Sequence, residues 1–398
     1  MLPGIREGEP VQWLPSGVRR DLARERPIHT FLLKVASRCN LDCSYCYIYS
    51  GPDQSWRERP RFMSVEVLSM VVQSIATHVR KHELTDVLIV FHGGEPLLVG
   101  AARLARYIET ITSTVPAKVE FSMQTNATLL RPDVLDVMAR HNVSFGISLD
   151  GGQEANDLNR PFRNGKGSYA AVMKALELVR SRPEWSALLR GFLAVIDLRT
   201  SPESVYEGLL TAGAKSLDIL LPDAHHDSPP PQHDPHEVRY GRWMTKLFDL
   251  WLDGQTSIEI RYFEEIIAMI LGGSSSLEAI GAKSVDLIVI ETEGDIEAVD
   301  TLKMVGRHVT RLGLNVARNS IDDAYQFPGV YSRMLGFDAL CDTCRSCQEL
   351  TRCGGGYLPH RYGNGKGFLN PSIYCEDIQF LIRHIRHRIT PAVQAATT

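Results

Sequence analysis

Three cysteines within eight residues constrain the fold of this chain more than any other feature. Cys39, Cys43 and Cys46 follow an apolar, strand-like run over residues 28–36. A loop that leaves a strand can curl three thiolates onto three corners of a cuboidal iron–sulfur cluster, which leaves the fourth iron without a protein ligand. Clusters held by four cysteines serve electron transfer, whereas an open iron can bind a substrate or cofactor and therefore indicates catalysis. The alternatives are a zinc site or a redox pair, although zinc sites usually complete four ligands from two nearby pairs.

The remaining cysteines favour metal binding over disulfides. Of the eight cysteines, three lie within 39–46, four within 341–353 and one at 375. Clusters at both ends of a chain that starts without a hydrophobic signal region are typical of metal sites in a reducing compartment. We therefore predict a cytoplasmic protein.

Length and charge narrow the range of functions. A chain of 398 residues is expected to form two domains, such as a large barrel with an appendage. The formal net charge of −4 argues against a nucleic-acid surface, which requires a basic patch. No segment reaches the apolar length of a membrane span. We expect neither nucleic acid nor a membrane among the partners.

Apolar strand-like runs alternate with helix-patterned stretches through the first half of the chain. Strands are expected at 28–36, 86–91, 118–123, 143–149, 189–196 and 216–221, and helices at 65–82, 101–112, 132–141, 169–181 and 202–212. Ser64 and Ser168 stand where helix N-caps are expected. Six strands, each followed by a helix, predict an α/β fold with a parallel sheet curved into a full or partial barrel. The loops after the strands carry the chemistry in such folds.

The predicted domain organisation has four segments. Residues 1–27 form an irregular N-terminal arm, 28–255 the barrel, 256–284 a helical linker and 285–398 a small, metal-organised C-terminal domain. In the last segment, residues 286–290 and 294–297 are expected to form a hairpin through Gly294. The loop over 222–231 contains His225 and His226, which as neighbours would point apart, so we interpret it as a structural or substrate-lining loop.

A glycine pair and a glutamate follow the second predicted strand. Gly93 and Gly94 let the backbone approach a ligand closely, and Glu95 places a carboxylate beside exposed backbone groups. A ligand with an α-amino group suits this arrangement. Methionine's amino and carboxylate groups would chelate the open iron, while Glu95 would hold the same amine.

These two motifs together resemble the radical S-adenosylmethionine (AdoMet) superfamily, whose members reductively cleave AdoMet at such a cluster to a 5′-deoxyadenosyl radical. The resemblance implies that polar strand ends contact the AdoMet ribose and sulfonium and that an arginine pairs with the methionine carboxylate. Strand-end capping is the alternative for the strand-end residues, and a surface position is the alternative for the arginine. The AdoMet-binding residues implied are Tyr45, Gly93, Gly94, Glu95, Asn126, Ser148 and Arg160. The Thr-Asn-Gly of the family is here Thr-Asn-Ala, with Ala127 in place of glycine.

The C-terminal cysteines are similar to those of the SPASM appendage, which in complete form holds two auxiliary clusters. Cys344, Cys347, Cys353 and Cys375 supply a full set for one auxiliary [4Fe–4S] cluster. The hairpin near Gly294 has no cysteine, and Cys341 is left as either a spare thiol or a substitute ligand. The implied fold is a partial (β/α)6 TIM-type radical SAM barrel with a C-terminal SPASM-like iron–sulfur domain, and the implied cofactors are AdoMet and two [4Fe–4S] clusters.

Segments such as FHGGEPLL, GISLDG, VIETEGDIEAVDTLK and CGGGYLPHRY resemble the cyclophane-forming radical SAM/SPASM peptide maturases of the FxsB type. That resemblance implies an oxidoreductase that joins an aromatic ring carbon to an unactivated β-carbon in a ribosomally made precursor peptide. It also implies a reducing partner such as flavodoxin or ferredoxin, and it allows for a separate peptide-recognition protein. The alternatives are thioether or sulfatase-type maturation, or a non-catalytic iron–sulfur electron carrier.

Asp300 is the predicted catalytic residue. It follows the hairpin that faces the cavity in complete SPASM domains, where an acid could take the proton released from the ring. The alternative is a cap for a turn or helix over residues 301–309.

Overall fold

The computed structural model describes residues 11–18, 21, 26–254 and 257–397. The strands are β1 (Thr30–Ala36), β2 (Asp86–Gly93), β3 (Lys118–Thr125), β4 (Val143–Ser148), β5 (Leu189–Val195), β6 (Ser216–Leu220), β7 (Glu259–Ile260), β8 (Leu287–Ile290), β9 (Asp295–Glu297) and β10 (Arg311–Asn315). The α-helices are α1 (Val65–Lys81), α2 (Gly100–Thr114), α3 (Pro132–Arg140), α4 (Gln153–Asn159), α5 (Tyr169–Arg180), α6 (Pro183–Ser186), α7 (Pro202–Thr211), α8 (Arg239–Asp253), α9 (Arg261–Ile270), α10 (Pro328–Tyr331), α11 (Asp342–Arg345), α12 (Leu350–Cys353) and α13 (Cys375–Thr397). Short 3-10 helices are η2 (Ser55–Arg57), η3 (Pro96–Val99), η4 (Asp300–Met304), η5 (Ile321–Gln326), η6 (Gly336–Ala339) and η7 (Pro359–Arg361).

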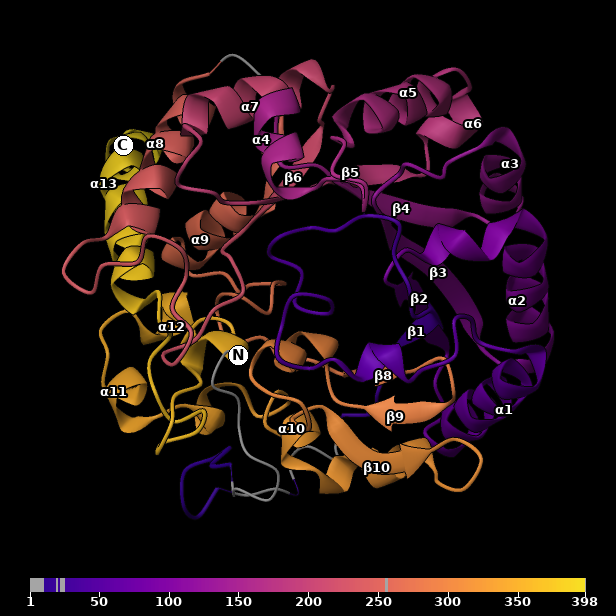
Figure 1. The fold of residues 1–398 in the computed structure, drawn as a ribbon. Coiled ribbons are helices and arrows are strands. Elements are labelled where there is room, and N and C mark those ends of the chain that lie inside the picture. The colour runs from indigo at the N-terminus through magenta and orange to yellow at the C-terminus, as the bar shows by residue number, and fades with distance from the viewer. Residues whose placement is uncertain (1–10, 19–20, 22–25, 255–256, 398) are drawn as a thin grey trace.

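The described strands form one sheet in the order β10-β9-β8-β1-β2-β3-β4-β5-β6-β7. Strands β1 to β7 are paired in parallel, with Leu33 opposite Phe91 in the β1–β2 register. The strands line the inside of a ring, and helices such as α1, α2, α3 and α5 cover its outside (Figure 1). The six predicted strand–helix units and the α/β barrel architecture are confirmed.

The sheet continues into the C-terminal part of the chain. β8 pairs in parallel with β1, and β9 pairs antiparallel with β8, so the predicted hairpin is confirmed. Gly294 makes the turn with φ +90°, where its amide donates to the Glu291 carbonyl at 2.8 Å. The predicted boundary at residue 285 therefore lies next to a strand that belongs to the barrel sheet, and the division into domains stays a prediction.

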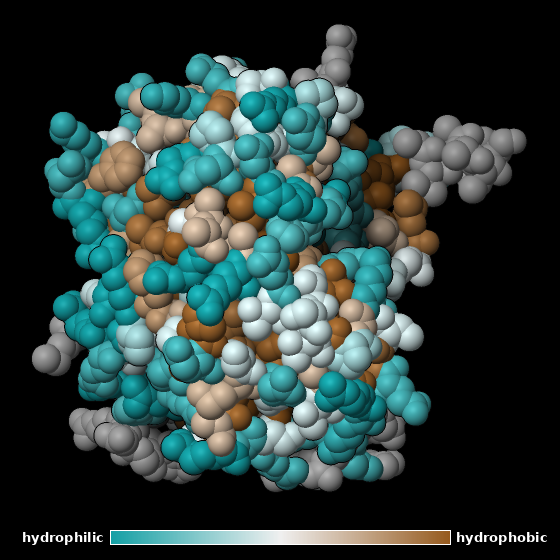
Figure 2. All heavy atoms as spheres, turned by 90° about the vertical axis from the view of Figure 1, so that its right-hand side faces the viewer, coloured by the Kyte–Doolittle hydropathy of each residue, from teal (hydrophilic) through white to brown (hydrophobic). Residues whose placement is uncertain are grey.

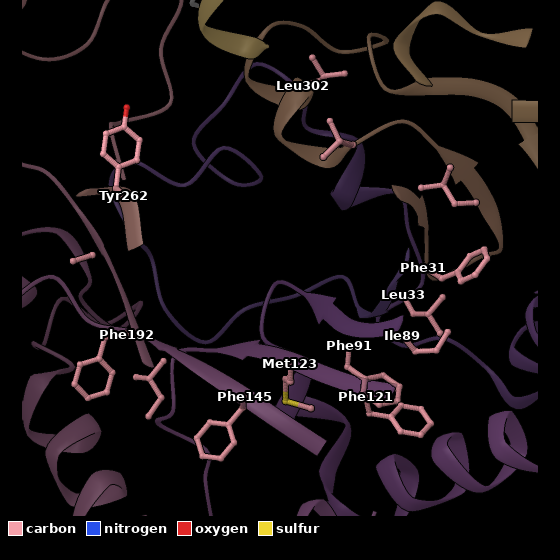
Figure 3. Close-up of a cluster of buried hydrophobic side chains, with 14 of the residues drawn as sticks. Phe31, Leu33, Ile89, Phe91, Phe121, Met123, Phe145, Phe192, Tyr262 and Leu302 are labelled. Carbon is pink, nitrogen blue, oxygen red and sulfur yellow. The ribbon is translucent and has the colours of Figure 1, made fainter. Parts of the chain in front are cut away.

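Period-two alternation along the strands separates the core from the cavity. Phe91, Phe121 and Phe145 are buried on the outer face of the sheet, where Phe91 and Phe121 stack with ring centroids 5.6 Å apart (Figure 3). The alternate residues, such as His92, Gln124 and Ser148, line the cavity inside the barrel. The alternation of side chains along each strand thus places polar side chains in the cavity and apolar side chains on the outer face of the sheet.

The helices pack an apolar stripe on the sheet, as α1 does with Leu68, Val71 and Ile75. Hydrophilic side chains cover much of the outer face that these helices present (Figure 2). Ser64 caps α1 as predicted, since its hydroxyl accepts from the Val67 amide at 3.2 Å. Ser168 is the N-cap residue of α5 as predicted, but its side chain makes no cap hydrogen bond. Its buried hydroxyl instead donates to the Arg160 carbonyl at 2.6 Å, so it fixes the segment that carries Arg160. Among the described helices, none has the length and apolar character to cross a membrane.

A buried ion cluster holds the hairpin against the loop before α1. Arg59 pairs with Glu291 and Glu297, and Lys303 pairs with the same two carboxylates. All four side chains are at most 5% exposed. Removing one member of a buried ion pair leaves an uncompensated charge, so the loss of any one of these four side chains should destabilise the contact between the hairpin and this loop.

Candidate functional site

A cavity of about 470 Å³ lies inside the barrel at the C-terminal ends of the strands. One wall is made by the three N-terminal cysteines and the Gly93–Glu95 segment. Apolar side chains, among them Leu193, Val195 and Tyr262, form another. Tyr357 and His360 reach it from the C-terminal segment. The cavity therefore brings the cysteine loop and the C-terminal segment to one place.

Cys39, Cys43 and Cys46 all line this cavity, although they carry no disulfide. Burial, with the nearby Glu95 carboxylate, raises the pKa of Cys39 to about 12, and burial raises the pKa of Cys43 to about 11. Three such thiols lose their protons only when a cation compensates the thiolate charge. The donor set thus fits an iron–sulfur cluster that is held by three cysteines and faces open space.

Glu95 is 1% exposed, yet it lines the cavity. Its Oε1 accepts from the Leu97 amide at 3.0 Å and from Thr125 Oγ1 at 2.7 Å, and its Oε2 accepts from the Asn126 amide at 2.8 Å. Burial raises the pKa of Glu95, which these hydrogen bonds partly oppose. A carboxylate fixed in this way retains lone pairs for an ammonium group, as the AdoMet assignment requires.

Close packing within the protein leaves no room for a side chain at Gly93 or Gly94. A Cβ at Gly93 would lie 2.1 Å from the Ala36 carbonyl oxygen, and one at Gly94 would lie 1.9 Å from the Tyr49 hydroxyl. The Gly94 and Glu95 amides donate to the Ala36 and Arg38 carbonyls, each at 3.0 Å. The pair therefore lets this segment pack against the base of the cysteine loop, in addition to lining the cavity.

Arg160 is buried rather than on the surface. Its guanidinium donates to Tyr45 Oη at 2.6 Å, and Tyr45 donates to Asp150 Oδ2 at 2.7 Å. Both Tyr45 and Arg160 line the cavity close to Cys43, whose thiolate the guanidinium favours. Asp150 was not among the predicted binding residues. The sequence feature that could have indicated Asp150 is the Leu-Asp-Gly at the end of β4. In the structure Asp150 orients Tyr45.

Asn126 and Ser148 both reach the cavity. Asn126 donates to Asn40 Oδ1 at 3.0 Å and to Cys39 Sγ at 3.7 Å, which ties β3 to the cysteine loop. Ser148 accepts from Gln124 Nε2 at 2.9 Å. Ala127 has φ +63°, so this residue adopts the left-handed conformation that favours glycine.

The predicted auxiliary-cluster residues converge in a separate place. Cys344, Cys347, Cys353 and Cys375 line one small cavity of about 50 Å³. Cys341 does not line it and packs instead with Leu340 and Cys344. Four thiols around one space fit a four-cysteine cluster.

Asp300 is held by a lysine that the sequence analysis did not single out. Lys34 is 3% exposed and forms an ion pair with Asp300, which also accepts from Tyr47 Oη at 2.9 Å. Burial alone would raise the pKa of Asp300, but the ammonium groups of Lys34 and Lys303 outweigh burial and hold this pKa well below the usual range. The N-cap residue of η4 is Val299, and the hydrogen bonds to the Asp300 carboxylate come from Lys34 and Tyr47, so the capping alternative is not seen for Asp300. The sequence feature that could have indicated Lys34 is its position as a single charged residue within an apolar parallel strand.

Residues 33–183 match the model of the Radical SAM superfamily. The match covers the three-cysteine loop and strands β2 to β4 of the parallel barrel, so over these residues the chain is similar to radical SAM domains, whose cofactors are AdoMet and an iron–sulfur cluster. The predicted fold class and these cofactors are thereby confirmed.

Most of the chain is similar to a sulfatase-maturating enzyme and to two solved structures with bound peptides. A cysteine-type anaerobic sulfatase-maturating enzyme from Clostridium novyi (strain NT) is 25% identical, with 88% of this chain and 93% of that enzyme covered. The structure of anSMEcpe with bound AdoMet and Cp18Cys peptide has a TM-score of 0.76 at 22% identity, covering 92% of this chain and 99% of that one. Streptococcus suis SuiB bound to the precursor peptide SuiA has a TM-score of 0.58 at 14% identity, covering 88% and 76%. The FxsB-type resemblance is not confirmed by these comparisons.

Proposed function

We propose that this protein is a radical SAM enzyme that oxidises a side chain in a peptide substrate. The supporting observation is the cavity itself, which is lined by the three-cysteine loop and Glu95 together with apolar side chains such as Leu193 and Val195. Its volume of about 470 Å³ accommodates the reactive end of AdoMet beside one substrate side chain.

When bound, AdoMet and its cluster supply a 5′-deoxyadenosyl radical that removes a hydrogen atom from carbon. The chain's own residues hold and orient the reactants. The Glu95 carboxylate binds the methionine ammonium, and the Arg160 guanidinium binds the methionine carboxylate. Ser148 and Asn126 bind ribose and orient the nucleoside. The apolar wall excludes water from the reactive carbon.

Sulfatase-type maturation is the first candidate chemistry. The Clostridium novyi enzyme covers nearly the whole chain, and anSMEcpe is similar in fold and was solved with a cysteine peptide. In this reading a serine or cysteine side chain enters the cavity and loses two hydrogens. Serine then gives an aldehyde directly, whereas cysteine gives a thioaldehyde, which water hydrolyses to the aldehyde with release of hydrogen sulfide.

Cyclophane formation is the second candidate chemistry, and the absence of a cysteine from the hairpin of β8 and β9 supports it. Val299 and the ion cluster of Arg59, Glu291, Glu297 and Lys303 occupy the hairpin region, which carries no cysteine for a second auxiliary cluster. The apolar wall with Tyr262 also suits an aromatic substrate ring. Both chemistries remove two hydrogens from the substrate and need a proton acceptor in the cavity.

The experiment is anaerobic reconstitution followed by mass spectrometry of candidate peptides. Reduced enzyme with AdoMet is offered three peptide sets: cysteine peptides, their serine variants, and short peptides encoded beside the gene that contain aromatic residues. An aldehyde product reacts with a hydrazide reagent. A cyclophane loses two hydrogens, resists the reagent and blocks backbone fragmentation between the joined residues.

The matched control replaces Cys39, Cys43 and Cys46 by alanine. It should keep the fold, because these side chains lie at the cavity surface, but it should form neither 5′-deoxyadenosine nor product. Release of 5′-deoxyadenosine by this variant would contradict the site assignment, and wild-type enzyme that modifies no peptide of any set would contradict the proposed function.

A further inference from the structure

Besides Glu95, three carboxyl groups line the cavity, and the proposed function gives none of them a role. Asp218 pairs with Arg261 and Glu278 pairs with Arg333, which leaves Asp223. Asp223 lies in the loop after β6 and lines the cavity together with Tyr357 and His360. In the part of the chain that the structure describes, no hydrogen bond or ion pair holds its carboxyl group. A carboxyl group that faces a cavity without a partner is available to a bound substrate.

Asp300 is the opposite case. It is 2% exposed, does not line the cavity, and is paired with Lys34 and Tyr47. The ammonium of Lys34 stabilises the ionised carboxylate, which makes Asp300 a weak base. Tyr47 lines the cavity and donates its hydroxyl hydrogen to Asp300, so of these two residues only Tyr47 reaches the cavity.

The charge of Asp300 acts on Asp223. Burial, and then the negative charge of Asp300, raise the pKa of Asp223 to about 7. Besides Asp300 on η4, the titratable groups that interact with Asp223 are Tyr47, Tyr357 and Tyr374. Burial raises the pKa of all three tyrosines, so they remain neutral, and burial lowers the pKa of His360 to about 3. Two carboxyl groups with separated pKa values indicate separate roles.

We propose that Asp223 accepts the proton that the substrate loses during oxidation in the cavity, while Asp300 stays ionised as the partner of Lys34. This inference rests on the proposed function. The substrate gives one hydrogen atom to the 5′-deoxyadenosyl radical, one electron to an oxidised iron–sulfur cluster and one proton to the Asp223 carboxylate. The substrate has then lost two hydrogens, and Asp223 ends as a neutral acid that returns its proton to water. The same balance gives an aldehyde from serine, a cyclophane from an aromatic peptide, and a thioaldehyde from cysteine, which water then hydrolyses to the aldehyde with release of hydrogen sulfide.

The test uses Asp223→Asn in the reconstituted enzyme, with Asp227→Asn as the matched control. Asp227 lies in the same loop, loses the same charge and does not line the cavity. A peptide deuterated at the reactive carbon reports hydrogen abstraction separately from product. Asp223→Asn should still transfer deuterium to 5′-deoxyadenosine, whereas product should fall by about 10²–10⁴-fold, the usual contribution of a positioned base.

A second readout does not depend on turnover. Infrared difference titration of the reconstituted enzyme with AdoMet but no reductant should show a protonated carboxyl band that disappears near the pKa of about 7. The band should persist in Asp227→Asn and be lost in Asp223→Asn.

The outcomes separate the inference from the proposed function. Normal product yield from Asp223→Asn, or an unchanged infrared band in that variant, overturns the assignment of Asp223. Loss of product in a folded Asp300→Asn variant, with Asp223→Asn active, assigns the proton to Asp300 instead. If the wild-type enzyme modifies no peptide, the proposed function fails, and the infrared titration still decides whether Asp223 is the group that exchanges a proton near neutrality.

Discussion

Replacing Lys34 by methionine tests whether this buried lysine keeps Asp300 ionised. Lys34 and Asp300 are 3% and 2% exposed, and the other groups beside the carboxylate are Tyr47 and His92. Burial lowers the pKa of His92 to about 4, with Lys34 acting in the same direction, so His92 is neutral in the wild type. Methionine keeps the side-chain length and removes the charge. Removing one partner of a buried ion pair costs about 3–5 kcal/mol.

The stability lost in Lys34→Met should depend on pH, in a direction that follows from the pKa of Asp300. In the wild type the folded pKa of Asp300 lies below its unfolded value, so its stabilisation is present above the unfolded pKa and is lost as pH falls through the folded pKa. In Lys34→Met, burial is no longer opposed by the ammonium and raises the folded pKa above the unfolded value. The carboxyl group then destabilises the fold at neutral pH and less so in acid. The stability gap between variant and wild type should shrink as pH falls from about 7 to about 5.

Hydrogen exchange measured by mass spectrometry on peptides from β1 and β2 is the assay. It reports the local free energy of opening and does not require two-state unfolding of a protein with bound clusters. Lys246→Met is the control, because Lys246 is 62% exposed in its pair with Glu203 and should change stability by no more than about 1 kcal/mol. The double variant Lys34→Met/Asp300→Leu should recover most of the loss. The role of Lys34 would be refuted if Lys34→Met and wild type differed in this free energy by less than about 1 kcal/mol at neutral pH and the difference did not vary with pH.

Three further predictions follow from the site. Reconstituted protein should contain about eight irons, replacement of Cys39, Cys43 and Cys46 by alanine should halve that number, and a count of about twelve would reveal a third cluster. Glu95→Gln should weaken AdoMet binding in equilibrium dialysis by roughly 1.5–3 kcal/mol, because the charge that pairs with the ammonium is lost, and unchanged binding would defeat this assignment. Asp223→Asn should flatten the pH dependence of the melting temperature. The raised folded pKa of about 7 makes the wild type most stable below the unfolded pKa and less stable as pH rises through 7, so an equal decline in both proteins would contradict it.

The barrel could be predicted from the sequence because its signals are local. Apolar runs, helical periodicity and the Ser64 cap are each contained in one short segment, so strands such as Asp86–Gly93 and helices such as Val65–Lys81 were predicted within a few residues of their bounds. The cysteines and Glu95 could be assigned for the same reason. Each motif directly follows a strand, and parallel strands end at a common edge.

The tertiary structure alone decided which distant residues meet and how they ionise. Lys34 and Asp300 are 266 residues apart, and they pair because β8 adds to the sheet beside β1. The sequence predicted a catalytic role for Asp300 and none for Asp223, although of these two residues only Asp223 lines the cavity. Whether a carboxyl group is a strong or a weak base depends on desolvation and on the charges around it. Those charges come from segments that only the closed sheet brings together, so no local pattern in the sequence contains this information.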